Sequence, residues 1–379
     1  MNKQRVYRAL LRLYPKPRYR QRYEGLLGDV AAILSWHRVK GAVFAVFREE
    51  GIIEQGVFGF AGRGMPVAAD TFFRVASVSK MITALCVMKL YESGLADIDR
   101  DVSSWLPFAL RHPLYRDDPI TLRMLMSHTS GIRDGADYMA GVHMARPAEE
   151  LLTGDSFSNS RPGDAWAYSN FGAGLVGSVL EGMTGLSFEQ AMQRYLFKPL
   201  GVTASFYPQR IDAPLADAVR LLPPGRPGFN AEERKQRTPL SPDTPMPGRH
   251  YGLAQGNCCI DARGVHRLCR ALMAPGFLKQ ATLDVMRRPH APFGARSRFM
   301  KQGLGLFLID SRDIAPRVLF GHQGNAYGAM HGVFFDPVSR TGMLFMSSSA
   351  SEARTEFLSD VNRALLVRYA AFMEEQGHG

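Results

Sequence analysis

The chain has 379 residues, of which 46% are hydrophobic and 21% charged, so it is long enough to bury a sizeable core. Residues 1–24 carry eight basic side chains and one acidic side chain, which accounts for +7 of the formal net charge of +11. The rest of the chain is therefore nearly balanced, which argues against a nucleic-acid-binding protein. No run approaches the roughly 18 apolar residues that cross a bilayer, so we expect no transmembrane helix.

The basic segment 1–24 has two interpretations. It could make weak contact with an anionic membrane surface, or it could be a solvated or helix-capping arm. It lacks the apolar stretch and the small-residue cleavage site of a secretory signal. The four cysteines have no zinc-ligand spacing and read as reduced thiols. Together these features predict a cytoplasmic protein.

The first elements after this arm are a helix and two strands. The pattern predicts a helix over 25–36 and strands over 41–47 and 52–58, joined by a polar turn. A second helix is predicted over 77–91, with Gly94 as its stop signal. This helix is apolar nearly all round, which predicts burial on most sides.

The middle of the chain reads as helix and loop, and the end returns to strands. From 97 to about 206 the pattern is mostly helical, with clear periodicity over 175–183 and 188–196. Residues 207–250 contain nine prolines and mixed charge, which is typical of a lid or an irregular insertion. The final predicted elements are strands over 303–309 and 318–320, a hairpin over 332–346 and a helix over 352–373.

Strands at both chain ends and helices between them predict an α+β fold. The strands would form one antiparallel sheet built from both ends of the chain, flanked by helices and interrupted by an inserted helical subdomain. The predicted organisation is a basic N-terminal arm over 1–24 and a single domain over 25–379, with 207–250 as its irregular lid.

Ser77 and Lys80 are the first candidates for chemistry. They lie at the start of the apolar helix, and their spacing places both side chains on one face. A serine hydroxyl needs a base to act as a nucleophile, and a buried lysine with a lowered pKa can supply one. The structural alternative is a capping serine beside a lysine whose amine reaches solvent.

Two further motifs provide partners for this pair. Tyr168 and Asn170 lie on a loop before a predicted helix, and they offer a phenol and an amide one residue apart. Near the C-terminus, His322 and Gly324 follow a predicted strand. The glycines there permit close approach of the backbone to a ligand, and His322 can donate a hydrogen bond toward it.

The motifs Ser77-x-x-Lys80, Tyr168-Ser169-Asn170 and His322-Gln323-Gly324, in this order, resemble those of serine beta-lactamases and penicillin-binding proteins. The second and third motifs are similar to the class C-like branch, which includes D-aminopeptidases and esterases. The flanking stretches "TFFRVASVSKMITALCVMKLYESGLADIDRDVSSWLP" and "ITLRMLMSHTSGI" resemble the same family. The resemblance covers roughly residues 39–346.

The resemblance implies a beta-lactamase/transpeptidase-like fold and a serine hydrolase mechanism. Ser77 would form an acyl-enzyme, and Lys80 and Tyr168 would share the work of the general base. Asn170 would orient Lys80 and the substrate, and His322 would face the substrate. The backbone N–H groups of Ser77 and Asn325 would form the oxyanion hole beside Gly324. No metal or organic cofactor is implied.

The implied substrate is a small ester or amide, such as a D-amino-acid or peptide-like compound. The alternatives are a beta-lactamase, a D-Ala-D-Ala carboxypeptidase, or a non-hydrolytic receptor of the penicillin-binding type. The family often shows an A-G-G-L turn, whereas this chain has Ala254-Gln255-Gly256-Asn257. This difference brings two amides near the expected rim of the site and bears on the substrate class. The oligomeric state is open.

Overall fold

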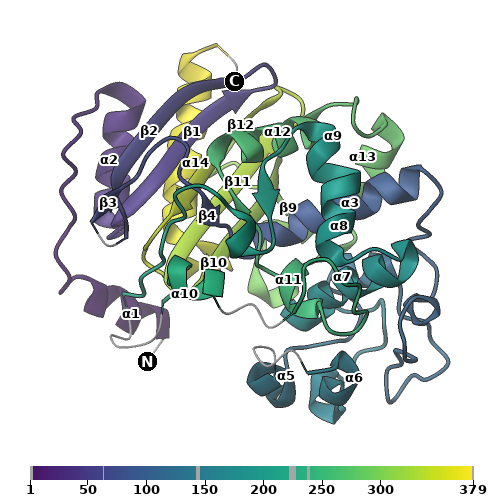
Figure 1. The fold of residues 1–379 in the computed structure, drawn as a ribbon. Coiled ribbons are helices and arrows are strands. Elements are labelled where there is room, and N and C mark those ends of the chain that lie inside the picture. Colours follow the sequence, from purple (N-terminus) through teal and green to yellow (C-terminus); the bar gives the residue numbers. More distant parts are fainter. Residues whose placement is uncertain (1–2, 63, 142–145, 222–227, 237–239, 378–379) are drawn as a thin grey trace.

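The computed structural model describes residues 3–62, 64–141, 146–221, 228–236 and 240–377 (Figure 1). Parts of the predicted lid, 222–227 and 237–239, lie outside the described residues. The rest of the lid contains a short helix, α10 (Ala231–Gln236), and apolar side chains such as Leu215 and Phe229 that pack against Phe72. The described lid residues are thus attached to the body of the protein.

A nine-stranded antiparallel sheet forms the centre of the molecule, in the order β3-β2-β1-β12-β11-β10-β9-β8-β7. Its strands are β1 (Gly41–Arg48), β2 (Ile52–Gly62), β3 (Met65–Pro66), β7 (Ala291–Pro292), β8 (Met300–Gln302), β9 (Phe307–Ile309), β10 (Leu319–Ala326), β11 (Ala329–Asp336) and β12 (Thr341–Ser347). Strands from the two chain ends meet where β1 pairs with β12. The predicted α+β fold is confirmed.

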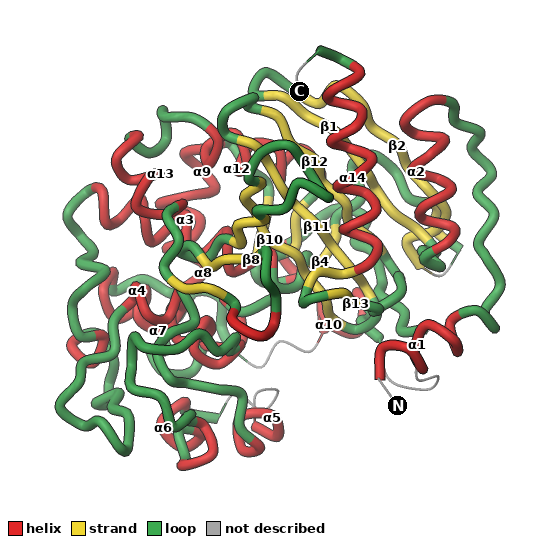
Figure 2. The backbone as a smooth tube through the Cα atoms, turned by 180° about the vertical axis from the view of Figure 1, so that it is seen from behind, coloured by secondary structure: helices red, strands yellow, loops and turns green. Residues whose placement is uncertain are grey.

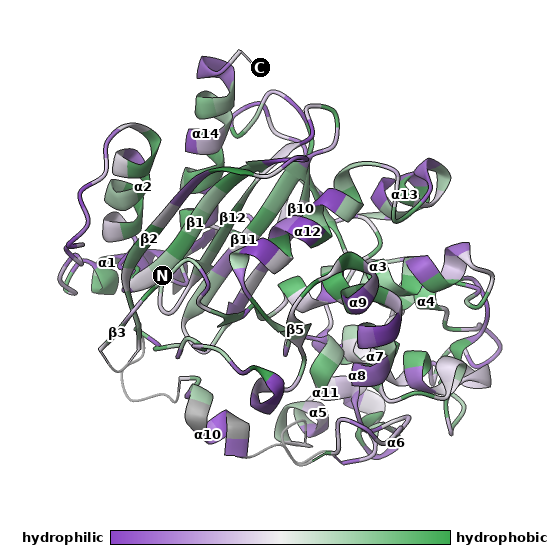
Figure 3. Cartoon of the chain, turned by 45° about the horizontal axis from the view of Figure 1, so that its top comes forward, coloured by the Kyte–Doolittle hydropathy of each residue, from purple (hydrophilic) through white to green (hydrophobic). Residues whose placement is uncertain are grey.

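Both faces of this sheet are buried. Along β1, Val43 and Ala45 pack into one apolar core, while Ala42 and Phe44 pack into a second core on the opposite face. This explains why the strand reads as a continuous apolar run rather than an alternating one. Figure 2 shows α2 (Gly25–Trp36) and α14 (Asp360–Glu375) covering the face of the second core. The central strands are mostly hydrophobic in Figure 3.

The first core joins the sheet to a helical region made by the middle of the chain. The helices not yet named are α1 (Lys3–Leu11), α3 (Val78–Glu92), α4 (Leu122–Met126), α5 (Ala136–Gly141), α6 (Ala148–Leu151), α7 (Asn170–Thr184), α8 (Phe188–Met192), α9 (Lys198–Leu200), α11 (Tyr251–Ala254), α12 (Ala262–Met273) and α13 (Gln280–Arg287). Twelve residues of α3 are buried, as its apolar sequence predicts. This helix therefore lies between the sheet and the helical subdomain.

A second, three-stranded sheet includes the strand that directly precedes α3. Its strands are β4 (Phe73–Arg74), β5 (Ala204–Ser205) and β6 (Cys259–Ile260), and they pair in the order β4-β6-β5. Because β6 pairs with β4 directly before α3, residues 255–258 are brought beside the start of that helix. The four cysteines are all buried and free. No helix among the described residues is long and apolar enough to cross a bilayer.

Three predicted elements differ from the structure. The strand predicted over 303–309 is limited to β9, because residues 303–306 form a connection after β8. The His322–Asn325 motif lies within β10 rather than after a strand. The C-terminal helix begins at Asp360 rather than at 352, because a two-stranded hairpin of β13 (Arg354–Thr355) and β14 (Leu358–Ser359) precedes it.

Candidate active site

Ser77 occupies the N-cap position of α3, and its side chain makes no capping hydrogen bond. The residue before it, Ala76, has a φ of 47° in the left-handed region, so the chain turns sharply as it enters the helix. The hydroxyl instead accepts from Lys80 Nζ at 3.0 Å and lies near the side chain of Tyr168. Ser77 is therefore not a simple capping residue.

Lys80 lies one turn into α3, where it is only 5% exposed. Its Nζ atom donates to Ser77 Oγ at 3.0 Å, to Asn170 Oδ1 at 2.9 Å and to the carbonyl of Gln255 at 2.6 Å. Burial lowers the pKa of Lys80 to about 7, although the carboxylate of Asp134 acts in the opposite direction. The amine is buried and does not extend into solvent, so the structural alternative for this pair does not describe the site.

Tyr168 is placed directly before α7 by a loop that packs around His128. The amide of Ala167 donates to the carbonyl of His128 at 2.8 Å, and the rings of His128 and Tyr168 lie 4.4 Å apart. Lys80 Nζ lies 5.1 Å from the centre of the Tyr168 ring. Burial raises the pKa of the Tyr168 phenol well above its usual value, so the phenol is protonated at neutral pH.

Asp134 is a site residue that the sequence analysis missed. Its carboxylate accepts hydrogen bonds from Asn170 Nδ2 at 2.8 Å, from the amide of Phe171 at 2.9 Å and from Ser169 Oγ at 3.1 Å. It therefore fixes the side-chain amide of Asn170 so that Oδ1 faces Lys80. The available signal was its position two residues after Ile132, the last residue of the stretch ITLRMLMSHTSGI that resembles the family.

His322 and Gly324 are two residues apart in β10 and therefore lie on the same face of the strand. His322 is fully buried and stacks on Phe307 with ring centres 4.0 Å apart. Its Nδ1 atom donates to the carbonyl of Gln323 at 2.6 Å, so Nε2 carries the lone pair of a neutral ring. Burial lowers the pKa of His322 to about 3. The ring therefore offers an acceptor through Nε2, whereas the sequence analysis expected a donor.

Gly324 is required by the close approach of β10 to α3. A Cβ atom at this position would lie 2.3 Å from the carbonyl oxygen of Val75 and 3.2 Å from the Cβ atom of Ala76. Such a contact with backbone is not tolerated without movement. The strand thus runs directly beside the residues that precede Ser77.

The backbone N–H group of Asn325 points toward the edge of β10 that faces away from β11. Asn325 is opposite Met330 in the ladder, and both backbone groups of Met330 bond to Ser347 Oγ, at 3.0 and 2.7 Å. In an antiparallel pair, the N–H of Asn325 must then point away from β11. β9 pairs with β10 only through residues 319–321, so no strand covers that edge within the described part of the chain.

Gln255 forms the opposite rim of the site, at the end of α11. Its carbonyl accepts from Lys80, and its side-chain oxygen accepts from the hydroxyl of Tyr138. The Tyr138 ring stacks on Phe171 with centres 4.7 Å apart. Among the described residues, no group of His, Cys, Asp and Glu side chains is arranged to hold a metal ion.

The family model described as Beta-lactamase matches residues 28–368. The chain belongs to the beta-lactamase family. It is 29% identical over 355 residues to Esterase EstB of Burkholderia gladioli, covering 83% of this chain and 87% of that one. It is 27% identical over 349 residues to Penicillin-binding protein 4 of Amycolatopsis lactamdurans, covering 88% and 87%.

The fold is similar to that of the solved structure of EstCE1, a hydrolase with promiscuous acyltransferase activity. The TM-score is 0.72 at 22% identity, and the match covers 92% of this chain and 98% of that one. The members of this family are serine hydrolases, and this chain is an enzyme of that class. The resemblance noted in the sequence is therefore confirmed across most of the chain.

Proposed function

We propose that the enzyme hydrolyses a small ester or amide through an acyl-enzyme on Ser77. The single observation that carries this proposal is the convergence of an amine and a phenol on one hydroxyl. Lys80 Nζ lies 3.0 Å from Ser77 Oγ, and the Tyr168 phenol lies close enough to the same hydroxyl to affect its own pKa. These groups come from segments about 90 residues apart in the chain, so packing of α7 against α3 is what assembles them.

The lowered pKa of Lys80 supports this amine as the group that receives the Ser77 proton. A pKa of about 7 leaves a large fraction of the Lys80 amine neutral at neutral pH. As Ser77 Oγ attacks the substrate carbonyl, its proton passes to Nζ, while the Tyr168 phenol donates its own proton to the departing oxygen or nitrogen. Lys80 Nζ then returns a proton to the Tyr168 oxygen, so both groups regain their starting protonation. Water then attacks the acyl carbonyl and gives a proton to these groups, the bond to Ser77 Oγ breaks, Oγ regains a proton, and the acid is released.

The negative charge that forms on the substrate oxygen would be stabilised by two backbone N–H groups. One belongs to Ser77 at the start of α3, and the other to Asn325 at the uncovered edge of β10. In other enzymes such a donor contributes about 3 kcal/mol to lowering the barrier. His322, Gly324 and Asn170 complete the surface that would bind the substrate.

The direct test is covalent labelling with a fluorophosphonate probe, followed by peptide mass spectrometry. We expect a single adduct on Ser77 in the wild-type protein and none in Ser77→Ala. A folded wild-type protein that remains unlabelled by an active reagent would contradict the proposal. A panel of p-nitrophenyl esters, D-amino-acid amides and nitrocefin, compared between the same two proteins, then ranks the substrate classes.

A non-hydrolytic receptor would share the first half of this reaction. It would give a burst of one equivalent of product and then stop, because its acyl-enzyme is not hydrolysed. Steady turnover after the burst identifies the hydrolase. The comparison uses p-nitrophenyl acetate and nitrocefin in parallel.

A further inference from the structure

The hairpin formed by β13 and β14 adjoins the candidate active site and cannot be stable by itself. Each strand has two residues, and the turn residues Glu356 and Phe357 have φ values of 48° and 74°. Left-handed conformations are costly for residues other than glycine, and so short a hairpin contributes little stability of its own. Contacts with other elements must therefore hold it in place.

On its inner side the hairpin is held by Gln323, the residue between His322 and Gly324. Gln323 Nε2 donates to the carbonyl of Phe357 at 2.8 Å, and Gln323 Oε1 accepts from the amide of Ser359 at 3.0 Å. The ring of Phe357 lies 5.6 Å from the ring of Tyr168. The hairpin thus contacts both the phenol and the strand of the proposed site.

The same ring belongs to an aromatic wall next to Tyr168. Phe357 lies 5.6 Å from Trp166 and 5.2 Å from Phe293, and Trp166 stacks on Phe293 at 4.0 Å. Trp166, Tyr168 and Phe357 are only partly buried. A displacement of the hairpin would therefore alter an apolar surface beside the nucleophile.

On its outer side the hairpin is held by Arg8 of α1. Arg8 Nε and Nη2 donate to the two carboxylate oxygens of Asp360 at 2.8 and 2.9 Å. Nη2 also donates to Thr355 Oγ1 at 2.9 Å and to the carbonyl of Arg354 at 3.0 Å. One guanidinium therefore joins β13 to the first residue of α14.

Two other residues of α1 bond to the backbone at the edge of β13. Gln4 Oε1 accepts from the amide of Arg354 at 2.9 Å, and the hydroxyl of Tyr7 accepts from the amide of Glu352 at 3.0 Å. Further along, Leu11 is buried against Leu221. Figure 2 shows α1 close to β13, below α14. In the structure, this part of the basic segment is bound to the body of the protein.

We propose that α1 is the outer anchor of the active-site hairpin, and that Arg8 is a positioning residue for the hydrolytic reaction. It acts through the hairpin on Phe357 and Tyr168 and touches no reacting atom itself. This inference rests on the proposed function at Ser77 for its catalytic part. The anchoring part stands on the contacts of α1 alone.

The test compares Arg8→Ala with Arg5→Ala, which removes the same charge from an exposed position of the same helix. Hydrogen exchange of the peptide covering 352–360 is measured first. We expect exchange to be about tenfold faster in Arg8→Ala and unchanged in Arg5→Ala, because several charged hydrogen bonds are lost only in the former. Arg8→Lys, which can contact Asp360 but not span to Thr355, should lie between them.

Kinetics with p-nitrophenyl acetate and p-nitrophenyl phenylacetate provide the second readout. In Arg8→Ala we expect KM for the phenylacetate to rise several-fold more than KM for the acetate, since only the larger acyl group needs the aromatic wall. Loss of thermal stability alone would lower the two activities equally. Gln4→Leu offers the same comparison if Arg8→Ala does not fold.

If hydrogen exchange over residues 352–360 is unchanged in Arg8→Ala, the proposal that α1 anchors the hairpin is wrong. Faster exchange with an unchanged ratio of the two KM values overturns the positioning role. If the wild-type protein is not labelled on Ser77, the proposed function fails, and the exchange experiment still decides whether α1 holds the hairpin.

Discussion

The amine of Lys80 has a proton affinity set by two opposing influences. Burial, with a smaller effect of the Arg74 charge, favours the neutral form, whereas the carboxylate of Asp134 favours the charged form, and the outcome is a pKa of about 7. The Tyr168 phenol lies beside this amine, and desolvation raises its pKa, so the phenol is kept neutral. Both groups are therefore ready to exchange protons with Ser77 without either holding a permanent charge.

The pH dependence of kcat/KM should reflect the titration of the Lys80 amine. If neutral Lys80 accepts the Ser77 proton, kcat/KM should rise with pH and level off above an apparent pKa of about 7, because the amine is protonated and inactive at lower pH. No falling limb from Tyr168 is expected near neutrality. The measurement is kcat/KM for p-nitrophenyl acetate between about pH 5.5 and 9. Lys80→Ala should lose about 10²–10⁴ of this activity. A flat profile would contradict the assignment.

Replacement of Asp134 by asparagine should shift that profile. The negative charge of Asp134 raises the pKa of Lys80, so its removal should move the rising limb below pH 7. The new amide would also direct a donor at Asn170 Nδ2, which should slow labelling of Ser77 by roughly tenfold.

The matched control for this substitution is Asp164→Asn, at an exposed position in the loop before Tyr168. It removes the same charge but leaves the contacts of Asn170 intact. If both variants gave the same apparent pKa for the rise in kcat/KM and the same rate of Ser77 labelling, Asp134 would have no special role.

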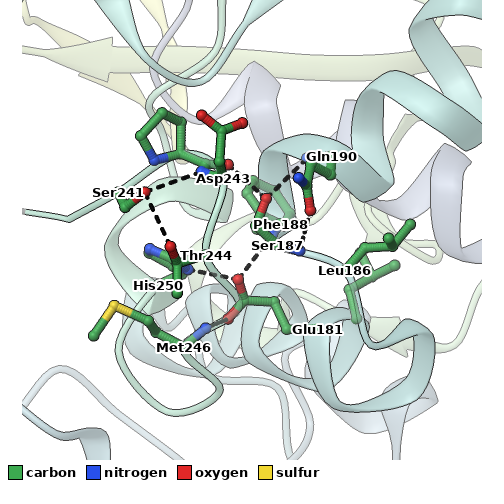
Figure 4. Close-up of polar contacts among 12 residues, drawn as sticks. Glu181, Leu186, Ser187, Phe188, Gln190, Ser241, Asp243, Thr244, Met246 and His250 are labelled. Carbon is green, nitrogen blue, oxygen red and sulfur yellow. Dashed lines mark hydrogen bonds and ion pairs between the residues drawn. The ribbon is translucent and has the colours of Figure 1, made fainter.

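At the scale of elements, a buried carboxylate joins α7, α8 and the segment that leads into α11 (Figure 4). Glu181 accepts from the amide of Phe188 at 2.8 Å, from the amide of Met246 at 3.2 Å and from His250 Nδ1 at 2.5 Å. Glu181 and His250 are both fully buried. Because α11 begins directly after His250 and ends directly before Gln255, this carboxylate also supports the Gln255 carbonyl that accepts from Lys80.

Glu181→Gln should destabilise the protein strongly. The new amide would direct donors at groups that are themselves donors, which leaves buried hydrogen bonds unmade and costs about 2–4 kcal/mol in the free energy of unfolding. Urea unfolding followed by fluorescence measures this change. Glu149→Gln, an exposed change in α6, serves as the control and should stay within about 0.5 kcal/mol of wild type. Equal midpoints for the two variants would show that the carboxylate is dispensable.

The elements differed in how well the sequence predicted them, for physical reasons. α3 and β1 are apolar runs bounded by clear signals, and both were predicted. The hairpin at 354–359 was merged into the C-terminal helix, because Arg354, Glu356 and Leu358 are good helix formers. Its turn places Glu356 and Phe357 in the left-handed region without a glycine to mark it. Local propensity cannot reveal a turn that is held by distant contacts with α1 and β10.

For the candidate site, ordered motifs predicted which residues meet but not how they are held. Asp134 was missed because its importance depends on the folded position of α7. The acceptor role of His322 was missed because it follows from the bond to the carbonyl of Gln323. Both depend on tertiary geometry, which motif spacing does not contain.

At the scale of the whole molecule, β1 contributes side chains to both cores, so the two cores should unfold together. Phe44→Ala acts on the core beneath α14, and Leu85→Ala acts on the core around α3. Each should cost about 3–5 kcal/mol and shift one shared transition, since a core lost on one face of the sheet exposes the other. Coincident urea curves by fluorescence and circular dichroism are expected for both variants. Two separated transitions in either variant would indicate independent units.

The pairing of β1 with β12 has a consequence for biosynthesis. β1 ends at Arg48 and β12 begins at Thr341, so the partner strand is translated about 290 residues later. At roughly 5–20 residues per second, a nascent chain would wait about 15–60 s with one side of that strand unpaired. For most of its synthesis the chain therefore carries β1 paired with β2 but without β12, and protection of that open edge by chaperones would matter most during this interval.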